Sequence, residues 1–409
     1  MELNVPNASK LNHELNKYEG VSVKKALKLI EKSEFKEDLI KLLDISDYEN
    51  DFIEIPGANL LVDIVLKREE NFKKFDVDSK IKNIRFIDID FDNNLGVLIE
   101  NIDDDKVLKR LKKSQLQVKT VTQSIKSDLL DNFYSINKFA SFCKDKGYDD
   151  VLTSAIREIE NKQIDEKRKL RLVEDGSNLY LRGFLTAKNY NDYNIPVSLF
   201  VTLLTLHKRF VLNEESYVLE SYNVGLSNIK AVFLQSTKKS IDNNVFQSFG
   251  IELNNNEIGK GSFSLKGVYS FTTSNYTIVA IPEKINTLSL FNIFHTTGLD
   301  KFKDNYLGIN VNIRNAIEIF QNNGSRIKKI KNFDEVLKFL EDSFLSSKSI
   351  NDKAIQIFKN KRTNRSTVKT LFEFLEQLGY IDNLLIQEDI QSLEYWRNKV
   401  YNTIFEKGK

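Results

Sequence analysis

The sequence predicts an α+β fold: a largely antiparallel central sheet packed on helices, an N-terminal α/β region and an all-helical C-terminal region. Residues 262–272 alternate between polar and apolar side chains with a period of two, with Val268 as the one exception, which is typical of a half-buried strand. Ser274 and Asn275 break the pattern, and residues 277–281 are expected to form a second strand. An apolar segment that begins at Pro196 has the composition of a buried helix. Beyond Pro282 strand patterns give way to helical ones, and such segregation of strands and helices is typical of the α+β class.

Within the first 165 residues we predict a mobile tail at 1–20 and an α/β region at 21–165. Apolar side chains at helical spacing indicate helices within 23–43 and 124–160, with an exposed one at 103–113. The strands expected in this region are Leu60–Val65, Ile84–Phe91, Leu95–Ile99 and Leu116–Val121. A charged segment that begins at Asn161 is expected to separate this region from the next one.

The central region is predicted at 170–285. A turn at Asp175–Gly176 indicates a hairpin, and Pro196 suits the first turn of a helix that reaches Arg209, because its missing N–H has no partner there anyway. The later strands are expected at Tyr217–Tyr222, Ile229–Leu234 and within 262–281. In that last segment one face should be buried (Phe263, Leu265, Tyr269, Phe271), and the other should be wet (Ser262, Ser264, Ser270).

The C-terminal region, 286–409, is predicted to be helical and to carry a basic patch. Apolar side chains at helical spacing place its helices near 310–320, 333–345, 352–359, 366–378 and 383–405.

Composition limits the classes of function. Across 409 residues, 60 Lys and Arg nearly balance 58 Asp and Glu, so any argument for nucleic acid must be local. The single cysteine, Cys143, excludes an internal disulfide and zinc sites built on paired cysteines. No uninterrupted apolar run near 18 residues is present, so we expect a cytoplasmic protein without membrane contact and predict no cofactor.

Three aspartates, Asp88, Asp90 and Asp92, alternate with Ile87, Ile89 and Phe91. On a strand the carboxylates would share one face, as ligands of Mg²⁺ or Mn²⁺ should. The simpler interpretation, which we favour, is the wet face of a sheet whose dry face is Ile87, Ile89 and Phe91.

Signals for catalysis are weak. None of the three histidines, His13, His207 and His295, belongs to a nucleophile motif such as G-x-S-x-G. The GKGS segment at 259–262 lacks the upstream glycine of a phosphate-binding loop. We therefore predict that the protein is not an enzyme.

The strongest local electrostatic signal lies between Arg326 and Lys369. Twelve Lys and Arg face five Asp and Glu in this segment, which gives a net charge of +7. Such a cluster is the first feature expected of nucleic-acid binding, although a solvated turn on a helical bundle has the same composition. Ser366 or Thr367 is expected to cap the following helix. The residues predicted to contact phosphates are Arg326, Lys328, Lys329, Lys359, Lys361, Arg362, Arg365 and Lys369.

Two short segments of the central region resemble the DUF932 family, whose members occur largely in phage- and plasmid-related proteins. The first runs from Arg182 to Asn194 and includes Tyr190, and the second is Asn255-Asn256-Glu257-Ile258-Gly259. The resemblance implies a mobile-element context. It also implies that four residues from separate loops converge on one site for a polar ligand or a single strand: Arg182, Tyr190, Asn255 and Glu257.

Together these observations predict a non-enzymatic nucleic-acid-associated protein of a phage or plasmid, for single-strand binding or recombination, with single-stranded DNA as the favoured partner. If phage-encoded, it would act in the host cytoplasm, and a homo-oligomer is compatible with the sequence. One alternative is a structural protein of a virion or its assembly. Another is a helix-turn-helix regulator built on Asp352–Leu378, with its turn at 363–365.

Overall fold

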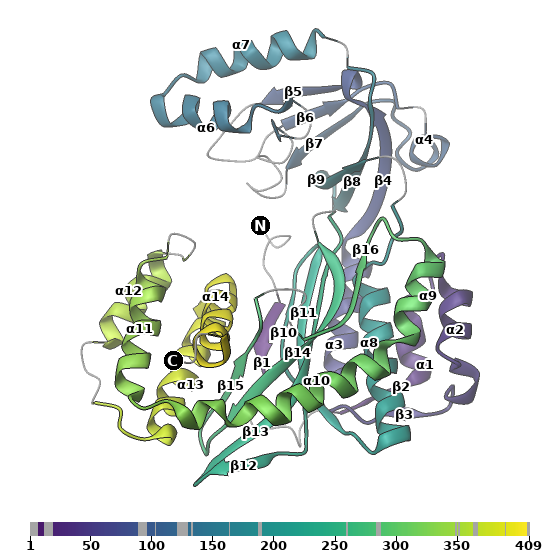
Figure 1. The fold of residues 1–409 in the computed structure, drawn as a ribbon. Helices are drawn as coiled ribbons and strands as arrows, with labels where there is room; N and C mark the ends of the chain where they lie inside the picture. The colour runs from purple at the N-terminus through teal and green to yellow at the C-terminus, as the bar shows by residue number, and fades with distance from the viewer. Residues whose placement is uncertain are drawn as a thin grey trace.

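The computed structural model describes most of the chain (Figure 1). It has the predicted α+β fold, with antiparallel sheets and a helical C-terminal region. The described residues are 7–11, 19–88, 96–102, 104–120, 130–131, 134–162, 164–186, 190–258, 261–283, 288–347, 350, 352–362, 367–388 and 390–406.

The larger sheet has eight strands, and each of its pairings is antiparallel. Its order is β1-β10-β11-β13-β14-β15, with β12 paired to β13 and β16 paired to β14. Strand β1 falls within the predicted mobile tail, which is therefore wrong at these residues, because β1 pairs with β10. The strands are β1 (Asn7–Lys10), β10 (Tyr217–Val224), β11 (Asn228–Gln235), β12 (Lys239–Asp242), β13 (Val245–Asn256), β14 (Ser262–Thr272), β15 (Thr277–Ala280) and β16 (Ser289–Phe294).

Helix α8 (Ile195–Asn213) is the central helix on one face of this sheet. The Asn194 side chain caps it by accepting from Val197 N at 3.0 Å, and Pro196 occupies its first turn as predicted. By length and composition α8 is the one helix among the described residues that could cross a membrane, but it is 78% buried inside the protein. Its apolar surface is therefore already used in the core.

The N-terminal helices pack around α8 in the same core. Helix α3 (Ala58–Asn71) contains residues 60–65, so the strand predicted there is wrong. Its buried side chains Leu61, Val62 and Val65 follow helical spacing, and the short apolar run did not distinguish the two structures. The other elements are β2 (Val21–Ser22), α1 (Val23–Ala26), η3 (Leu27–Ile30), α2 (Lys36–Leu42), η4 (Ile45–Asp47) and β3 (Phe52–Ile53).

Strand β14 is buried on both faces. The predicted core side chains Phe263, Leu265, Tyr269 and Phe271 are at most 1% exposed, which confirms their register. The predicted wet face is wrong, because Ser262, Ser264 and Ser270 are buried as well. Helix α14 (Ile390–Tyr401) lies on that second face of the sheet, opposite α3 and α8 (Figure 1).

The second sheet has six strands in the order β4-β8-β9-β7-β6-β5, and only its β7–β9 pairing is parallel. Its hydrophobic core is separate from that of the first sheet. Its elements are β4 (Lys73–Lys80), η5 (Ile81–Asn83), β5 (Ile84–Asp88), β6 (Gly96–Ile99), α4 (Asp105–Leu111), β7 (Leu116–Thr120), α6 (Asn137–Lys146), α7 (Asp149–Glu160), β8 (Lys167–Asp175) and β9 (Asn178–Thr186).

The six-stranded sheet therefore spans residues 73–186, between two parts of the chain that share the other core. The boundary predicted at 165–170 is wrong, because β8 and β9 complete the sheet that β4 begins. The predicted hairpin at Asp175–Gly176 joins β8 to β9. The sheet that a strand joins depends on partner strands that are distant in the sequence, and a charged linker does not reveal those partners.

The C-terminal region is not all-helical as predicted, because β16 lies within it and pairs with β14. Its helices lie on both sides of the eight-stranded sheet (Figure 1). Helices α11 to α14 lie on the side away from α8, whereas α9 and α10 lie on the side of α8, where Tyr306 of α9 accepts from Thr205 at 3.3 Å and Phe320 of α10 packs on Tyr269. The helix break predicted between residues 378 and 383 is wrong, because α13 continues to Glu388. The helices are α9 (Leu299–Leu307), α10 (Ile309–Asn323), the 3₁₀ helix η6 (Gly324–Lys329), α11 (Phe333–Leu345), α12 (Asp352–Arg362), α13 (Leu371–Glu388), α14 (Ile390–Tyr401) and the π-helical turn η7 (Asn402–Glu406).

Candidate functional site

The four residues that the family resemblance implicated lie together in one buried network. Arg182 Nη1 donates to Glu257 Oε2 at 2.7 Å, and both side chains are at most 2% exposed. Tyr190 OH donates to the Glu257 carbonyl at 2.7 Å. Asn255 Nδ2 donates to Tyr193 O at 2.7 Å and to Ser198 Oγ at 3.1 Å. The predicted convergence is thus present, but the prediction that all four residues come from loops is wrong, because Arg182 lies on β9 and Asn255 on β13. Binding of a ligand there stays a prediction.

Glu257 is the centre of this network. Besides Arg182, its carboxylate accepts from Lys74 Nζ at 3.2 Å and from Ile195 N at 2.9 Å, at the start of α8. Burial alone would raise the pKa of Glu257, but Lys74, Arg182 and Arg171 together hold that pKa well below its usual range. Glu257 is therefore ionised at neutral pH.

Arg171 was not among the predicted site residues, yet it touches most of the network. Its Nη1 donates to the Glu257 carbonyl at 2.6 Å and to Tyr190 OH at 2.7 Å. Asp192 accepts from Nη2 at 3.0 Å and Asp76 from Nε at 3.2 Å. Burial would lower the pKa of Arg171, but these two carboxylates raise it above its usual range. In the sequence Arg171 is one cation among several on a strand, and nothing local marks its partners.

His295, directly after strand β16, closes the network. Its Nε2 lies 3.1 Å from Asn255 Oδ1, and its ring stacks on Tyr190 with centroids 5.1 Å apart. Burial lowers the pKa of His295, so the ring is neutral at pH 7. Sequence reasoning set this histidine aside because it lacked a nucleophile motif, and here it acts as a packing and hydrogen-bonding partner.

The network joins the two sheets. Lys74, Arg171 and Arg182 come from the six-stranded sheet, whereas Asn255 comes from the eight-stranded one and Glu257 directly follows it. Within the described residues Arg182 Nε has no hydrogen-bond partner, but the other donors named above are directed at groups of the network itself. Because these charged groups already pair with one another, the network is better suited to hold the two sheets rigidly together than to bind an exchangeable ligand.

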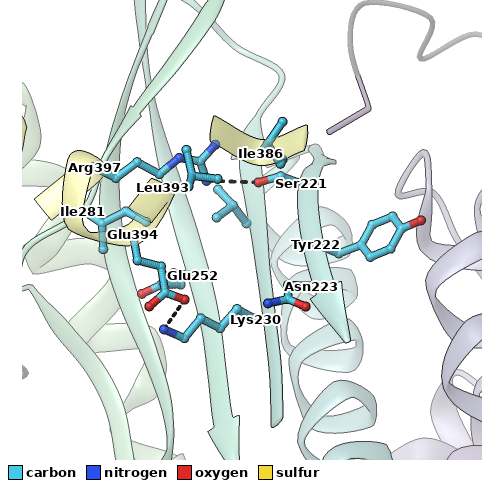
Figure 2. Close-up of a pocket in the computed structure, with 11 residues that line it drawn as sticks. Ser221, Tyr222, Asn223, Lys230, Glu252, Ile281, Ile386, Leu393, Glu394 and Arg397 are labelled. Atoms are coloured by element: carbon cyan, nitrogen blue, oxygen red, sulfur yellow. Dashed lines mark hydrogen bonds and ion pairs between the residues drawn. The ribbon is translucent and has the colours of Figure 1, made fainter. Parts of the chain in front are cut away.

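A second buried polar cluster lies where α14 packs on the sheet (Figure 2). Arg397 donates to both Asp382 oxygens at 2.9 and 2.8 Å and to Ser221 Oγ at 3.2 Å. Lys230 pairs with Glu394 beside the buried Glu252. The cavity that they line holds about 30 Å³, enough for about one water molecule and too small for an organic ligand. This cluster therefore holds α14 on the sheet.

The predicted basic residues lie on three segments of the helical region. Arg326, Lys328 and Lys329 are exposed on η6, and Lys359 and Lys369 are exposed on α12 and just before α13. Lys361 and Arg362 belong to α12, but their side chains lie outside the described part of the chain, as does all of Arg365. The turn proposed for a helix-turn-helix, 363–365, also falls there.

Contacts bring two of these segments to one end of the region. Val368 N donates to Asp334 Oδ1 at 3.2 Å, so the chain before α13 lies against the first turn of α11, which follows η6. The cap of α13 is Thr370, not the predicted Ser366 or Thr367. Thr370 Oγ1 accepts from Glu373 N at 3.1 Å, and the Glu373 carboxylate accepts in return from Thr370 N at 3.1 Å, which is a capping box.

A groove of about 770 Å³ runs beside η6 and the start of α11. Three cations, Arg326, Lys329 and Lys331, line it together with two acids, Glu335 and Glu406. Its remaining lining is mainly apolar: Ile330, Val336, Phe339, Ile404 and Phe405.

The π-helical turn η7 forms one wall of this groove and is fixed to the core. Phe405 stacks on Tyr269 of β14 with centroids 4.2 Å apart, and its carbonyl accepts from Arg326 Nη1 at 2.9 Å. The prediction missed the groove because η7 lies about 75 residues beyond η6 in the sequence. The signal for the groove that the sequence did offer was an aromatic, Phe339, beside Lys338 on a polar helix face.

The acidic candidate is only partly described. Asp88 is the last residue of β5, and Asp90 and Asp92 lie outside the described residues. The predicted dry face is wrong at Ile87, which is 40% exposed, whereas Phe86 is fully buried. A β-bulge between Phe86 and Asp88 shifts the register there. Among the described residues no group of three or more His, Cys, Asp or Glu side chains could hold a metal ion.

The chain matches no family model, no curated protein and no solved structure. The DUF932 resemblance therefore stays a prediction.

Proposed function

We propose that this protein binds single-stranded DNA without enzymatic activity, through the basic end of its C-terminal helical region. The observation that carries the proposal is the groove beside η6, where three exposed cations, Arg326, Lys329 and Lys331, here called its rim, share the lining with mainly apolar side chains. Cations at a rim suit phosphates, and an apolar interior suits unpaired bases, so the combination favours a single strand over a duplex. Lys369, tethered nearby through its neighbour Val368, extends the positive surface.

The DUF932 resemblance supports a phage or plasmid origin, with action in the host cytoplasm. In that setting a single-strand binder would serve replication or recombination intermediates. The buried Glu257 network has a supporting part in this proposal, because it sets how the six-stranded sheet is held against the rest of the protein.

The proposal is tested by reversing two rim charges, Lys329→Glu and Lys331→Glu, and titrating a labelled oligo-dT at several salt concentrations. Affinity should fall for all sequences alike. The slope of log affinity against log salt should flatten by about 1.4, at ~0.7 for each lost phosphate contact on a single strand. The matched control reverses Lys24 and Lys28, which are exposed on α1 and η3, and should bind like wild type. Unchanged affinity in the folded rim variant would contradict the proposal.

A second candidate is an assembly role, which an exposed apolar stripe favours. Leu307, Val311 and Ile319 are 73%, 55% and 46% exposed on α9 and α10. Exposed apolar side chains of this size on neighbouring helices are typical of protein–protein contacts. Light scattering over a concentration series would show self-association that Val311→Asp abolishes.

A further inference from the structure

The groove beside η6 has two chemically distinct parts, and each suits a different part of a nucleotide. Its rim carries Arg326, Lys329 and Lys331, whereas its wall carries Phe339, which is 44% exposed although it is a large aromatic. Val336, one helical turn before Phe339, and Ile330 extend the apolar surface.

The size of the groove is also informative. About 770 Å³ lies within the ~300–1,000 Å³ of pockets that enclose small organic molecules. A phosphate alone needs much less room and no apolar wall. The volume and the lining thus fit a nucleobase with its sugar.

We infer that the groove takes unpaired bases, which stack on Phe339 while their phosphates contact Arg326, Lys329 and Lys331. This inference rests on the proposed function and specifies how the site separates single strands from duplexes. Bases in a duplex are paired and stacked on one another, so they cannot enter the groove without the cost of unstacking.

Two acids in the lining set the strength of binding. Glu335 and Glu406 reduce the formal charge from the three cations, +3, to +1. They repel phosphates but not bases, so a strand is drawn in mainly where its bases can reach the apolar wall. Glu335→Gln should therefore tighten binding of both normal and abasic strands.

The test compares three ligands of equal length by fluorescence anisotropy: oligo-dT, an abasic deoxyribose-phosphate oligomer and a duplex. Wild type should bind oligo-dT more tightly than the abasic strand. Phe339→Ala should weaken oligo-dT binding about 5- to 150-fold, the effect expected of one base–aromatic stack, and leave abasic binding unchanged. Phe339→Trp should restore binding of oligo-dT. Phe142→Ala, at a phenylalanine of similar exposure on α6, is the matched control and should have no effect.

The outcomes separate this inference from the proposed function. Suppose that Phe339→Ala binds oligo-dT like wild type, and that binding still falls when the rim charges are reversed. The proposed phosphate contacts would then be supported, and the inference that bases enter the groove would be wrong. If wild type binds none of the three ligands, both are wrong. A melting temperature for each variant shows that the comparison is between folded proteins.

Discussion

Arg182 and Glu257 form a buried ion pair of 2.7 Å between residues 75 positions apart in the sequence. Arg182 lies on β9 of the six-stranded sheet, and Glu257 directly follows β13 of the eight-stranded sheet. The pair therefore spans the joint between the two sheets, with Lys74 and Arg171 as further cations around the same residue.

Removal of the Glu257 charge should destabilise the protein strongly. Glu257→Gln leaves buried cations without their counter-charge, and breaking a buried pair in this way costs about 3–5 kcal/mol. Urea denaturation of both proteins measures the difference. The control is Asp38→Asn in the half-exposed Lys303–Asp38 pair, for which we expect about 1 kcal/mol or less. Equal effects of the two substitutions would show that the network does not stabilise the fold.

The same carboxylate should make stability depend on acid. The folded-state pKa of Glu257 lies below its ordinary value of 4.5, so the unfolded chain takes up the proton first as pH falls. Its contribution is present above about pH 4.5 and is lost as pH falls toward the folded pKa. Between pH 5 and 3 the unfolding free energy should drop less in Glu257→Gln than in wild type. Parallel pH profiles would assign acid sensitivity to other groups.

Glu252 should have the opposite effect on the pH dependence of stability. Burial raises the pKa of this carboxyl, with Glu394 as a further cause, so the folded protein retains a proton that the unfolded chain has lost. Its favourable contribution is present below about pH 4.5 and declines as pH rises through the folded pKa. Glu252→Gln should therefore gain stability relative to wild type between pH 4 and 8, measured by chemical denaturation. A constant difference across that range would contradict this assignment.

The register of β14 predicts a large effect for one core substitution. Phe263 is fully buried and packs on Phe291 with ring centroids 5.0 Å apart. Phe263→Ala should cost about 3–5 kcal/mol in unfolding free energy, from lost burial and the cavity left behind. Phe139→Ala, at a side chain 38% exposed on α6, should shift it by under ~0.5 kcal/mol. A small loss at Phe263 would mean that the site collapses around the cavity.

By itself the sequence determined the elements whose local pattern reflects their own burial. The alternation of β14, the helix that starts at Pro196 and the strands β10 and β11 were all predictable, because periodicity records which side of one element faces a core. The resemblance also named four residues that do meet in space.

Only the tertiary structure decided which distant segments pair. It placed β8 and β9 in the sheet of β4, and it set α14 on a face of the eight-stranded sheet that the sequence predicted to be wet. It also supplied Arg171 and His295 to the Glu257 network, and η7 to the groove beside η6. These relationships depend on hydrogen bonds and contacts between residues tens of positions apart, and a local pattern carries no information about partners at that distance.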